Sequence, residues 1–510
     1  MKEDDTNRPA PPVYPWAPAS PSRARRLFRV QDAMFHPIVW ILIAVAIGAF
    51  LGTQAVGTAQ RYTKLLVALV FVFAIFRFPS FVGVGIFLLL YPFPARIQIG
   101  STNMIFIVLL AVAWMIRMGL NKEPRIQRTD LDWPIFAYLA AHILSLINVE
   151  SMPLLVNSLN SLLALAVPIL FYYIVVHVTD DERKFFFLIR MFTISVTVLY
   201  LMAFLERFAP HVQLLPRWYV SVLGAWDPDP DSVQRVGGMI SNVMMSDMAA
   251  IFVILQLFLM FRSRSGWRWV HGGLAVVSIY VLSITGNRGG PIALLVGGLY
   301  FLWIFRREVT LKRMLAAAAI FVGVAVIAEQ SLGRIEGNIT LFNRFAGTYF
   351  ERGLPDTRRI TWMYAWNMIK ENPLLGHGPY FSHQEIYPGI KPVWPHNGFL
   401  FYLFTIGFVG LPTFLFMLGQ VLRRTWAGHG LRVREISLAR GMMAVMHIAT
   451  VQFIIGQMRS DHQRGDVYIY LMWILFAFGI LARRLYDRER RVPAPSPPPI
   501  LAGAIARPGR

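Results

Sequence analysis

The chain has 510 residues, of which 56% are hydrophobic, 15% are charged and none is cysteine. A soluble globular chain carries about 25% charged residues. Here the charges gather in short stretches between apolar runs of roughly 17 to 25 residues, the length that spans a bilayer. The lack of cysteine excludes disulfides and cysteine-ligated zinc or iron–sulfur sites. The net charge of +21 fits membrane topology and anionic lipid better than nucleic acid, because it lies beside the apolar runs.

The two ends of the chain differ in composition from the rest. Residues 1–37 are polar and proline-rich and end in a basic stretch, and residues 487–510 are again proline-rich. Such segments are typical of disordered tails. No small-residue cleavage site follows the first apolar run, so we expect that run to be retained as a helix. The domain between the tails is predicted to cover residues 38–486.

Apolar runs in this domain predict an all-α polytopic membrane protein with about fourteen transmembrane helices. The second and third runs are short and could form one hairpin. The runs are 38–57, 64–78, 80–95, 102–120, 133–149, 159–178, 184–206, 240–262, 268–285, 290–305, 312–328, 397–422, 437–458 and 466–484.

Lysine and arginine predict the orientation of these helices. With both termini in the cytoplasm, the short outer loops hold few basic residues and the inner loops hold most of them, as the positive-inside rule requires. Two outer segments, 207–238 and 329–396, are too long to be turns, and loops of this length are usually functional or disordered. The second, between the eleventh and twelfth helices, contains the amphipathic pattern Trp362, Met363, Trp366, Ile369, which predicts a helix at the membrane surface.

Arg288 is the first candidate for chemistry. It lies in Thr285-Gly286-Asn287-Arg288-Gly289-Gly290, a predicted outer turn between two helices. Glycines let a backbone approach a ligand closely, and a guanidinium can hold a phosphate through a forked pair of hydrogen bonds. The alternative is an arginine that only extends its charge to the membrane interface.

His396 is the second candidate, where the long outer loop re-enters the membrane. An imidazole can take a proton from an attacking hydroxyl, and Asn397 could orient it. The alternative is a histidine that caps a helix or completes a core hydrogen bond. Arg358 and Arg359 could bind phosphate or stack on a sugar, or could form a solvated face. Arg235 is a weaker candidate, and Asp247 is an intramembrane acid that is functional by default or paired with a nearby arginine.

Several motifs are missing from the sequence. It has no P-loop and no His-Glu-x-x-His zinc motif, and no close acidic pair of a metal-dependent glycosyltransferase in its outer segments. An arginine-rich outer site that is poor in carboxylates suits an anionic substrate that already carries its leaving group.

These features together resemble the O-antigen ligase and polymerase superfamily, over a segment from residue 235 to about 410. The order and spacing of six pieces carry the resemblance: Arg235-Val236-Gly237-Gly238, Thr285–Gly290, Arg358 with Trp362, Glu371-Asn372-Pro373-Leu374-Leu375-Gly376-His377-Gly378, His396-Asn397-Gly398-Phe399-Leu400 and Ile406-Gly407-Phe408-Val409-Gly410-Leu411. His377 departs from the pattern, which has a hydrophobic residue there. The family-like core is expected to cover 235–425.

The resemblance implies transfer of a glycan from undecaprenyl diphosphate to a hydroxyl, at the periplasmic face of the bacterial inner membrane. The acceptor is lipid A-core in a ligase and a second lipid-linked glycan in a polymerase. Arg288 and His396 would be catalytic, and Arg358, Arg359, Arg235 and Asn397 would bind the diphosphate or sugar. No metal, cofactor or nucleic acid is implied, and other polysaccharide assembly proteins are possible partners.

Competing interpretations remain. About fourteen helices lean slightly towards a polymerase of capsule, exopolysaccharide or O-antigen. A transporter or flippase of lipid-linked glycan would need polar residues at the centre of many helices and symmetry between halves, whereas the polar candidates here gather at the outer face and no repeat is apparent. A structural membrane subunit without chemistry is the third class.

Overall fold

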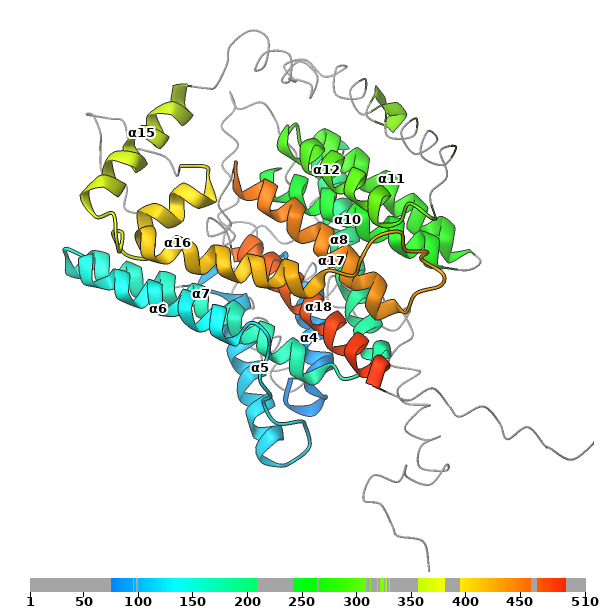
Figure 1. Ribbon diagram of the computed structural model, residues 1–510, viewed down its shortest axis with the longest axis horizontal. Coiled ribbons are helices and arrows are strands. Elements are labelled where there is room, and N and C mark those ends of the chain that lie inside the picture. The colour runs from blue at the N-terminus through cyan, green and yellow to red at the C-terminus, as the bar shows by residue number, and fades with distance from the viewer. Residues whose placement is uncertain are drawn as a thin grey trace, which may run out of the picture. The chain divides into compact units, whose positions relative to one another are not determined.

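Figure 1 shows the computed structural model of the chain. It describes residues 75–94, 96–97, 100–208, 242–263, 266–308, single positions between 312 and 330, and residues 356–380, 395–459 and 466–491. The chain divides into two compact units, and all described residues belong to the unit formed by Lys64–Gln213 and Arg217–Arg510. The other unit, Met1–Thr63 with Leu214–Pro216, lies outside the described residues and includes the first predicted tail. Arg235 and the part of the second predicted tail beyond residue 491 also lie outside them.

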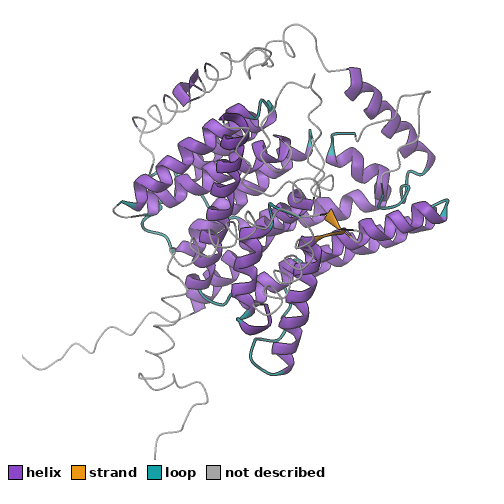
Figure 2. Ribbon diagram, turned by 180° about the vertical axis from the view of Figure 1, so that it is seen from behind, coloured by secondary structure: helices purple, strands orange, loops and turns teal. Residues whose placement is uncertain are grey.

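The described part is helical, which confirms the predicted fold class. One antiparallel ladder of two-residue strands, β1 (Arg96–Ile97) and β2 (Gly100–Ser101), is the exception (Figure 2). The helices are α4 (Ser80–Leu90), α5 (Thr102–Gly119), α6 (Asp132–Ser145), the short 3-10 helix η1 (Leu146–Asn148), α7 (Met152–Val178), α8 (Glu182–Phe208), α10 (Asn242–Arg262), α11 (Trp267–Ile284), α12 (Gly289–Ile304), α15 (Asp356–Glu371), α16 (Gly398–Thr425), α17 (Leu438–Gln457) and α18 (Asp466–Arg491).

Within the described ranges, 8 helices are long and apolar enough to cross a membrane, and α4 and α12 are shorter apolar helices. The predicted run at 38–57 lies outside the described residues, as does most of 64–78, and 312–328 is described only at single positions. The loops 207–238 and 329–396 are described only at residues 207–208, 330, 356–380 and 395–396. The count of fourteen and the size of the loop between helices 11 and 12 therefore stay predictions.

Two helices form the centre of the described fold. α10 packs against α11, α12 and α17, and α18 packs against α7, α16 and α17. Both are buried along most of their length, so their polar side chains lie inside protein. Polar groups in that setting need partners, because the interior offers no water to satisfy them.

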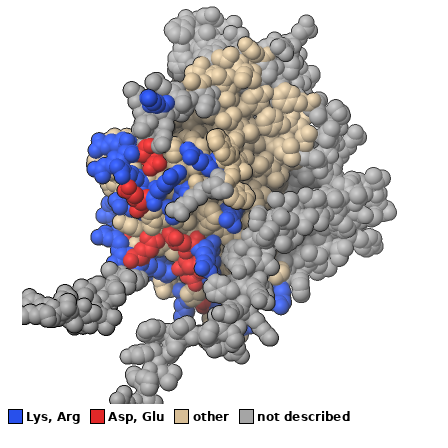
Figure 3. Space-filling model, turned by 90° about the vertical axis from the view of Figure 1, so that its right-hand side faces the viewer, with Lys and Arg blue, Asp and Glu red and all other residues tan. Residues whose placement is uncertain are grey.

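The helix ends that carry most of the charge are tied together at one side of the fold. Arg262 at the end of α10 donates to the Ile436 carbonyl, 2.9 Å away, and Arg424 at the end of α16 lies 2.9 Å from Asp130. Arg484 of α18 donates to the carbonyl of Val176 in α7 over 3.0 Å. Figure 3 shows lysine, arginine, aspartate and glutamate gathered on part of one face. We call this side the basic end.

α16 was predicted as one continuous helix, and the structure breaks it at Gly407. This residue has φ 65° and ψ −168°, a conformation that suits glycine. The segment Pro373–Gly378 fills the break. Phe408 N donates to Pro373 O over 2.8 Å and Val409 N to Leu374 O over 3.0 Å, while Gly378 N donates to Thr405 O over 3.1 Å. The helical hydrogen bonds lost at the break are thus replaced by this segment.

Candidate functional site

Arg288 lies in a tightly defined turn between α11 and α12. Gly286 has φ 60°, and Asn287 N donates to Thr285 Oγ1 over 3.3 Å. The side-chain oxygen of Asn287 accepts a hydrogen bond from Gly289 N over 3.0 Å, which satisfies one free amide at the start of α12. The backbone on both sides of Arg288 is therefore fixed, while the Arg288 side chain is partly exposed.

A buried ion pair lies beside this turn. Asp247 of α10 is 3% exposed and pairs with Arg459, just beyond the end of α17. Tyr468 of α18 donates its hydroxyl to the other carboxylate oxygen of Asp247. Burial lowers the pKa of the Arg459 guanidinium, and Tyr468 opposes that shift. An arginine still remains protonated. The sequence-based alternative of an arginine partner for Asp247 is thus confirmed.

Arg459 also touches the turn that carries Arg288. It donates to the side-chain oxygen of Asn287, and a Cβ placed on Gly289 would overlap the guanidinium. Sequence reasoning did not single out Arg459. The available signal was that Arg459 opens a short predicted outer loop, which also contains Arg464, directly after an apolar run.

His396 begins the segment that enters α16. It has φ 50°, which is uncommon for a residue other than glycine, and its side chain is partly exposed. Asn397 is the N-cap of α16, because its side-chain oxygen accepts from Phe399 N (3.0 Å) and Leu400 N (3.2 Å). The helix-capping role that the sequence offered as an alternative for His396 therefore belongs to Asn397.

The His396 segment and the Arg288 turn meet at the end of α17. A Cβ on Gly398 would lie 2.6 Å from Oε1 of Gln457, two residues before Arg459, which contacts Gly289 and Asn287. The structure thus brings two of the sequence-predicted elements together around residues 457–459. We call the turns and helix ends at 285–290, 395–398, 457–459 and 466–468 the site end. It lies opposite the basic end, because α10 and α17 run from one to the other.

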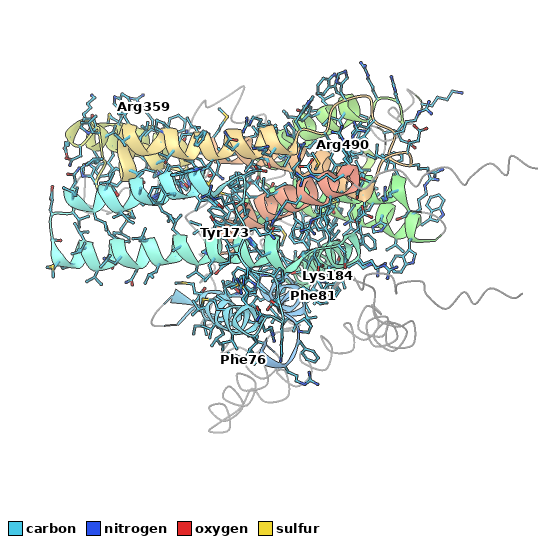
Figure 4. All side chains as sticks on the ribbon, turned by 60° about the horizontal axis from the view of Figure 1, so that its bottom comes forward. Phe76, Phe81, Tyr173, Lys184, Arg359 and Arg490 are labelled. Atoms are coloured by element: carbon cyan, nitrogen blue, oxygen red, sulfur yellow. The ribbon has the colours of Figure 1, made fainter. Side chains whose placement is uncertain are left out.

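α15 connects Arg358 to the same place. Trp362, one turn after Arg358, donates its indole N–H to the Pro395 carbonyl over 2.6 Å, directly before His396. Arg358 is partly buried, whereas Arg359 is exposed and projects from α15 in Figure 4. The predicted helix is confirmed. The residues of its expected apolar face differ in burial, because Ile369 is buried and Trp366 is 45% exposed.

His377, which departs from the family pattern, has structural partners. One ring nitrogen lies 2.7 Å from the Met368 carbonyl and the other 3.2 Å from the Asn372 amide nitrogen. The ring stacks on Phe404 at a centroid distance of 5.0 Å. These contacts join the end of α15 to the first half of α16, and they account for a polar residue at this position.

The geometry offers two kinds of chemistry at the site end. The guanidinium groups of Arg288 and Arg358 can hold an anion and stabilise charge that develops on it. The imidazole of His396 can accept a proton from a hydroxyl. Arg459 is bound to Asp247 and Asn287, so its role is to hold the turn.

Comparison with known proteins gives two matches. The family described as O-Antigen ligase matches residues 273–415, a segment that includes Arg288, Arg358 and His396 but neither Asp247 nor Arg459. The chain is also 26% identical over 250 residues to an O-antigen ligase of Salmonella typhimurium strain LT2, covering 44% of this chain and 55% of that protein. The chain thus spans about half the length of this relative. The resemblance predicted from the motifs is confirmed.

Proposed function

We propose that this chain, a multi-pass bacterial membrane protein of the O-antigen ligase superfamily, transfers a glycan from undecaprenyl diphosphate to an acceptor hydroxyl in the synthesis of surface polysaccharide. One observation carries the proposal: the Arg288 turn, the His396 segment and the start of α15 are joined through Gln457, Arg459 and the Trp362–Pro395 hydrogen bond. These links between segments far apart in sequence support the proposal that Arg288, Arg358 and His396 contribute to one site.

The proposed step is a substitution at the anomeric carbon of the donor sugar. The acceptor oxygen forms a bond to this carbon, while the bond from the carbon to the diphosphate oxygen breaks and its electron pair leaves with undecaprenyl diphosphate. His396 takes the proton of the acceptor hydroxyl. Arg288 and Arg358 stabilise the negative charge that grows on the diphosphate. The diphosphate supplies the driving force, so the step needs no nucleotide.

The remaining candidates have smaller roles in this scheme. The side-chain oxygen of Asn397 is used in capping α16, so only its amide nitrogen is available to a sugar. Arg235 stays a proposed substrate contact outside the described residues. Arg359 lies on the exposed side of α15, so we assign the diphosphate contact to Arg358. We place the site at the periplasmic face of the inner membrane, with both termini in the cytoplasm.

The proposed step is compatible with two kinds of acceptor. Lipid A-core would make the chain a ligase, and the terminal sugar of a second lipid-linked glycan would make it a polymerase. The expected number of helices leans to a polymerase, whereas the matched relative is named a ligase. The products separate the two: loss of a polymerase leaves single repeat units, and loss of a ligase leaves long chains that are not attached.

Substitution of His396 by alanine tests the proposal. Loss of a general base costs about 100- to 10,000-fold in rate, so H396A is expected to abolish surface glycan at normal protein level, with lipid-linked glycan accumulating on the outer leaflet. H429A is the matched control, because His429 stacks on Trp303 near the basic end. Wild-type amounts of polymer in H396A would overturn the role of His396. Accumulation on the inner leaflet would indicate a flippase.

A further inference from the structure

Asn287 receives two hydrogen bonds on one side-chain oxygen, from the Gly289 amide and from the Arg459 guanidinium. The first bond closes the turn over Arg288. The second ties that closed turn to α17, from which it is 172 residues distant in sequence. The backbone conformation at Arg288 is therefore held by a side chain from the turn that follows α17.

The Arg459 guanidinium is itself held from the other side. Its second terminal nitrogen binds Asp247, whose remaining carboxylate oxygen accepts from Tyr468. The Arg459 side chain is 15% exposed and that of Asp247 is 4% exposed. A planar guanidinium can reach two acceptors in fixed directions, which a lysine ammonium on a flexible stem does not do. The Arg459 guanidinium thus bridges Asp247 of α10 and Asn287 of the turn.

Gly289 fits this arrangement. The guanidinium occupies the space where a Cβ of residue 289 would lie, so a side chain there would displace Arg459 from Asn287. Gly298, on the same helix, has nothing within 4 Å of its Cβ position. A side chain at position 289 would therefore collide with Arg459, whereas one at position 298 would meet nothing.

We propose that Arg459 is a positioning residue for Arg288: it holds the 285–290 turn through Asn287, with Asp247 and Tyr468 fixing the guanidinium in place. This inference rests on the proposed function, because the consequence of misplacing Arg288 is read as slower glycan transfer. Arg459 lies outside the segment that matches the O-Antigen ligase family. It is placed by the structure alone.

The test compares R459K, G289A and G298A in the purified full-length protein in lipid nanodiscs. The donor is lipid-linked glycan extracted from a strain that lacks this chain. R459K keeps a charge for Asp247, and G289A keeps the arginine but displaces it. A misplacement of about 1 Å can cost about 100-fold in rate, so kcat is expected to fall about 10- to 100-fold in both, with KM for the donor changed less. G298A is expected to match the wild type.

A double substitution makes the test specific. In R459A the space beside Gly289 is vacant, so R459A/G289A is expected to be no slower than R459A, a non-additive result that reports contact between the two sites. Wild-type kcat in R459K would overturn the inference, because Arg459 would then be only a counter-ion of Asp247, and additive losses would overturn it too. A wild-type protein without transfer would instead overturn the proposed function, and the inference with it.

Discussion

Arg358 and Arg359 are neighbours in sequence but lie on different faces of α15. Arg358 is partly buried and one turn before Trp362, which binds the carbonyl beside His396, whereas Arg359 is exposed. If Arg358 stabilises charge on the leaving diphosphate, R358A is expected to lower transfer about 100- to 1,000-fold. R359A should stay within a few-fold of wild type. The measurement is the rate of glycan transfer by each variant. An equal loss of rate in both would contradict the assignment to Arg358.

At this scale the sequence predicted residues that stand in recognisable motifs. Arg288 and His396 were found because glycine-rich and His-Asn-Gly motifs mark them, and the structure brings their segments together at residues 457–459. Arg459 does not lie in a recognisable motif. Its importance depends on Asp247 and Asn287, which are distant in sequence, and only the folded chain shows that the three lie in contact.

The break in α16 allows a prediction at the level of whole elements. A Cβ at Gly407 would overlap the Leu374 carbonyl, and its positive φ costs a residue with a side chain about 1–2 kcal/mol. Each bond lost from Phe408 or Val409 costs about 1 kcal/mol more. G407A is therefore expected to lower the melting temperature of the purified protein by several degrees and to reduce transfer, since the same segment leads back to α15.

Gly419 is the matched control on the same helix. Nothing lies within 4 Å of its Cβ position, and alanine is favoured over glycine inside a helix by about 1 kcal/mol. G419A is thus expected to melt at or above the wild-type temperature. If G407A had the same melting temperature as G419A, the docking of Pro373–Gly378 would contribute nothing to stability.

Helix positions were largely predictable, and their irregularities were not. The apolar run at 102–120 became α5 at Thr102–Gly119, and 268–285 became α11 at Trp267–Ile284, because bilayer thickness imposes the length of each run. α7 begins at Met152, seven residues before the predicted 159, since Ser151 caps it and Pro153 suits its first turn. α18 continues to Arg491, so residues 487–491 of the second predicted tail are helical, and the rest of that tail lies outside the described residues.

The break in α16 illustrates why such irregularities are hard to predict. Gly407, Gly410 and Pro412 weaken the helix, but an interrupted helix inside a membrane is tolerated only where other protein groups satisfy its backbone. Those groups come from Pro373, Leu374 and their neighbours, in a different part of the chain. A local pattern contains no information about that pairing.

Within the residues that the structure describes, many charged side chains gather at the basic end, whereas the candidates Arg288 and His396 lie at the site end. Arg424 pairs with Asp130 and Arg484 contacts Gln127, so loops between different helices are joined where the basic residues gather. The alternation of helices predicted from lysine and arginine would produce such a separation, and that alternation stays a prediction. From the positive-inside rule we expect the basic end to face the cytoplasm and the site end to face the periplasm, and this orientation stays a prediction.

Cysteine labelling tests this orientation, and the chain suits it because it has no cysteine of its own. Arg359 and Arg490 are both exposed and lie well apart in Figure 4, one on α15 and one at the end of α18. In spheroplasts treated with a maleimide that does not cross membranes, R359C is expected to be labelled and R490C to be labelled only after permeabilisation. The cysteine-free parent reports background. Labelling of R490C alone before permeabilisation would invert the orientation and place the site in the cytoplasm, where a donor on the outer leaflet does not reach it.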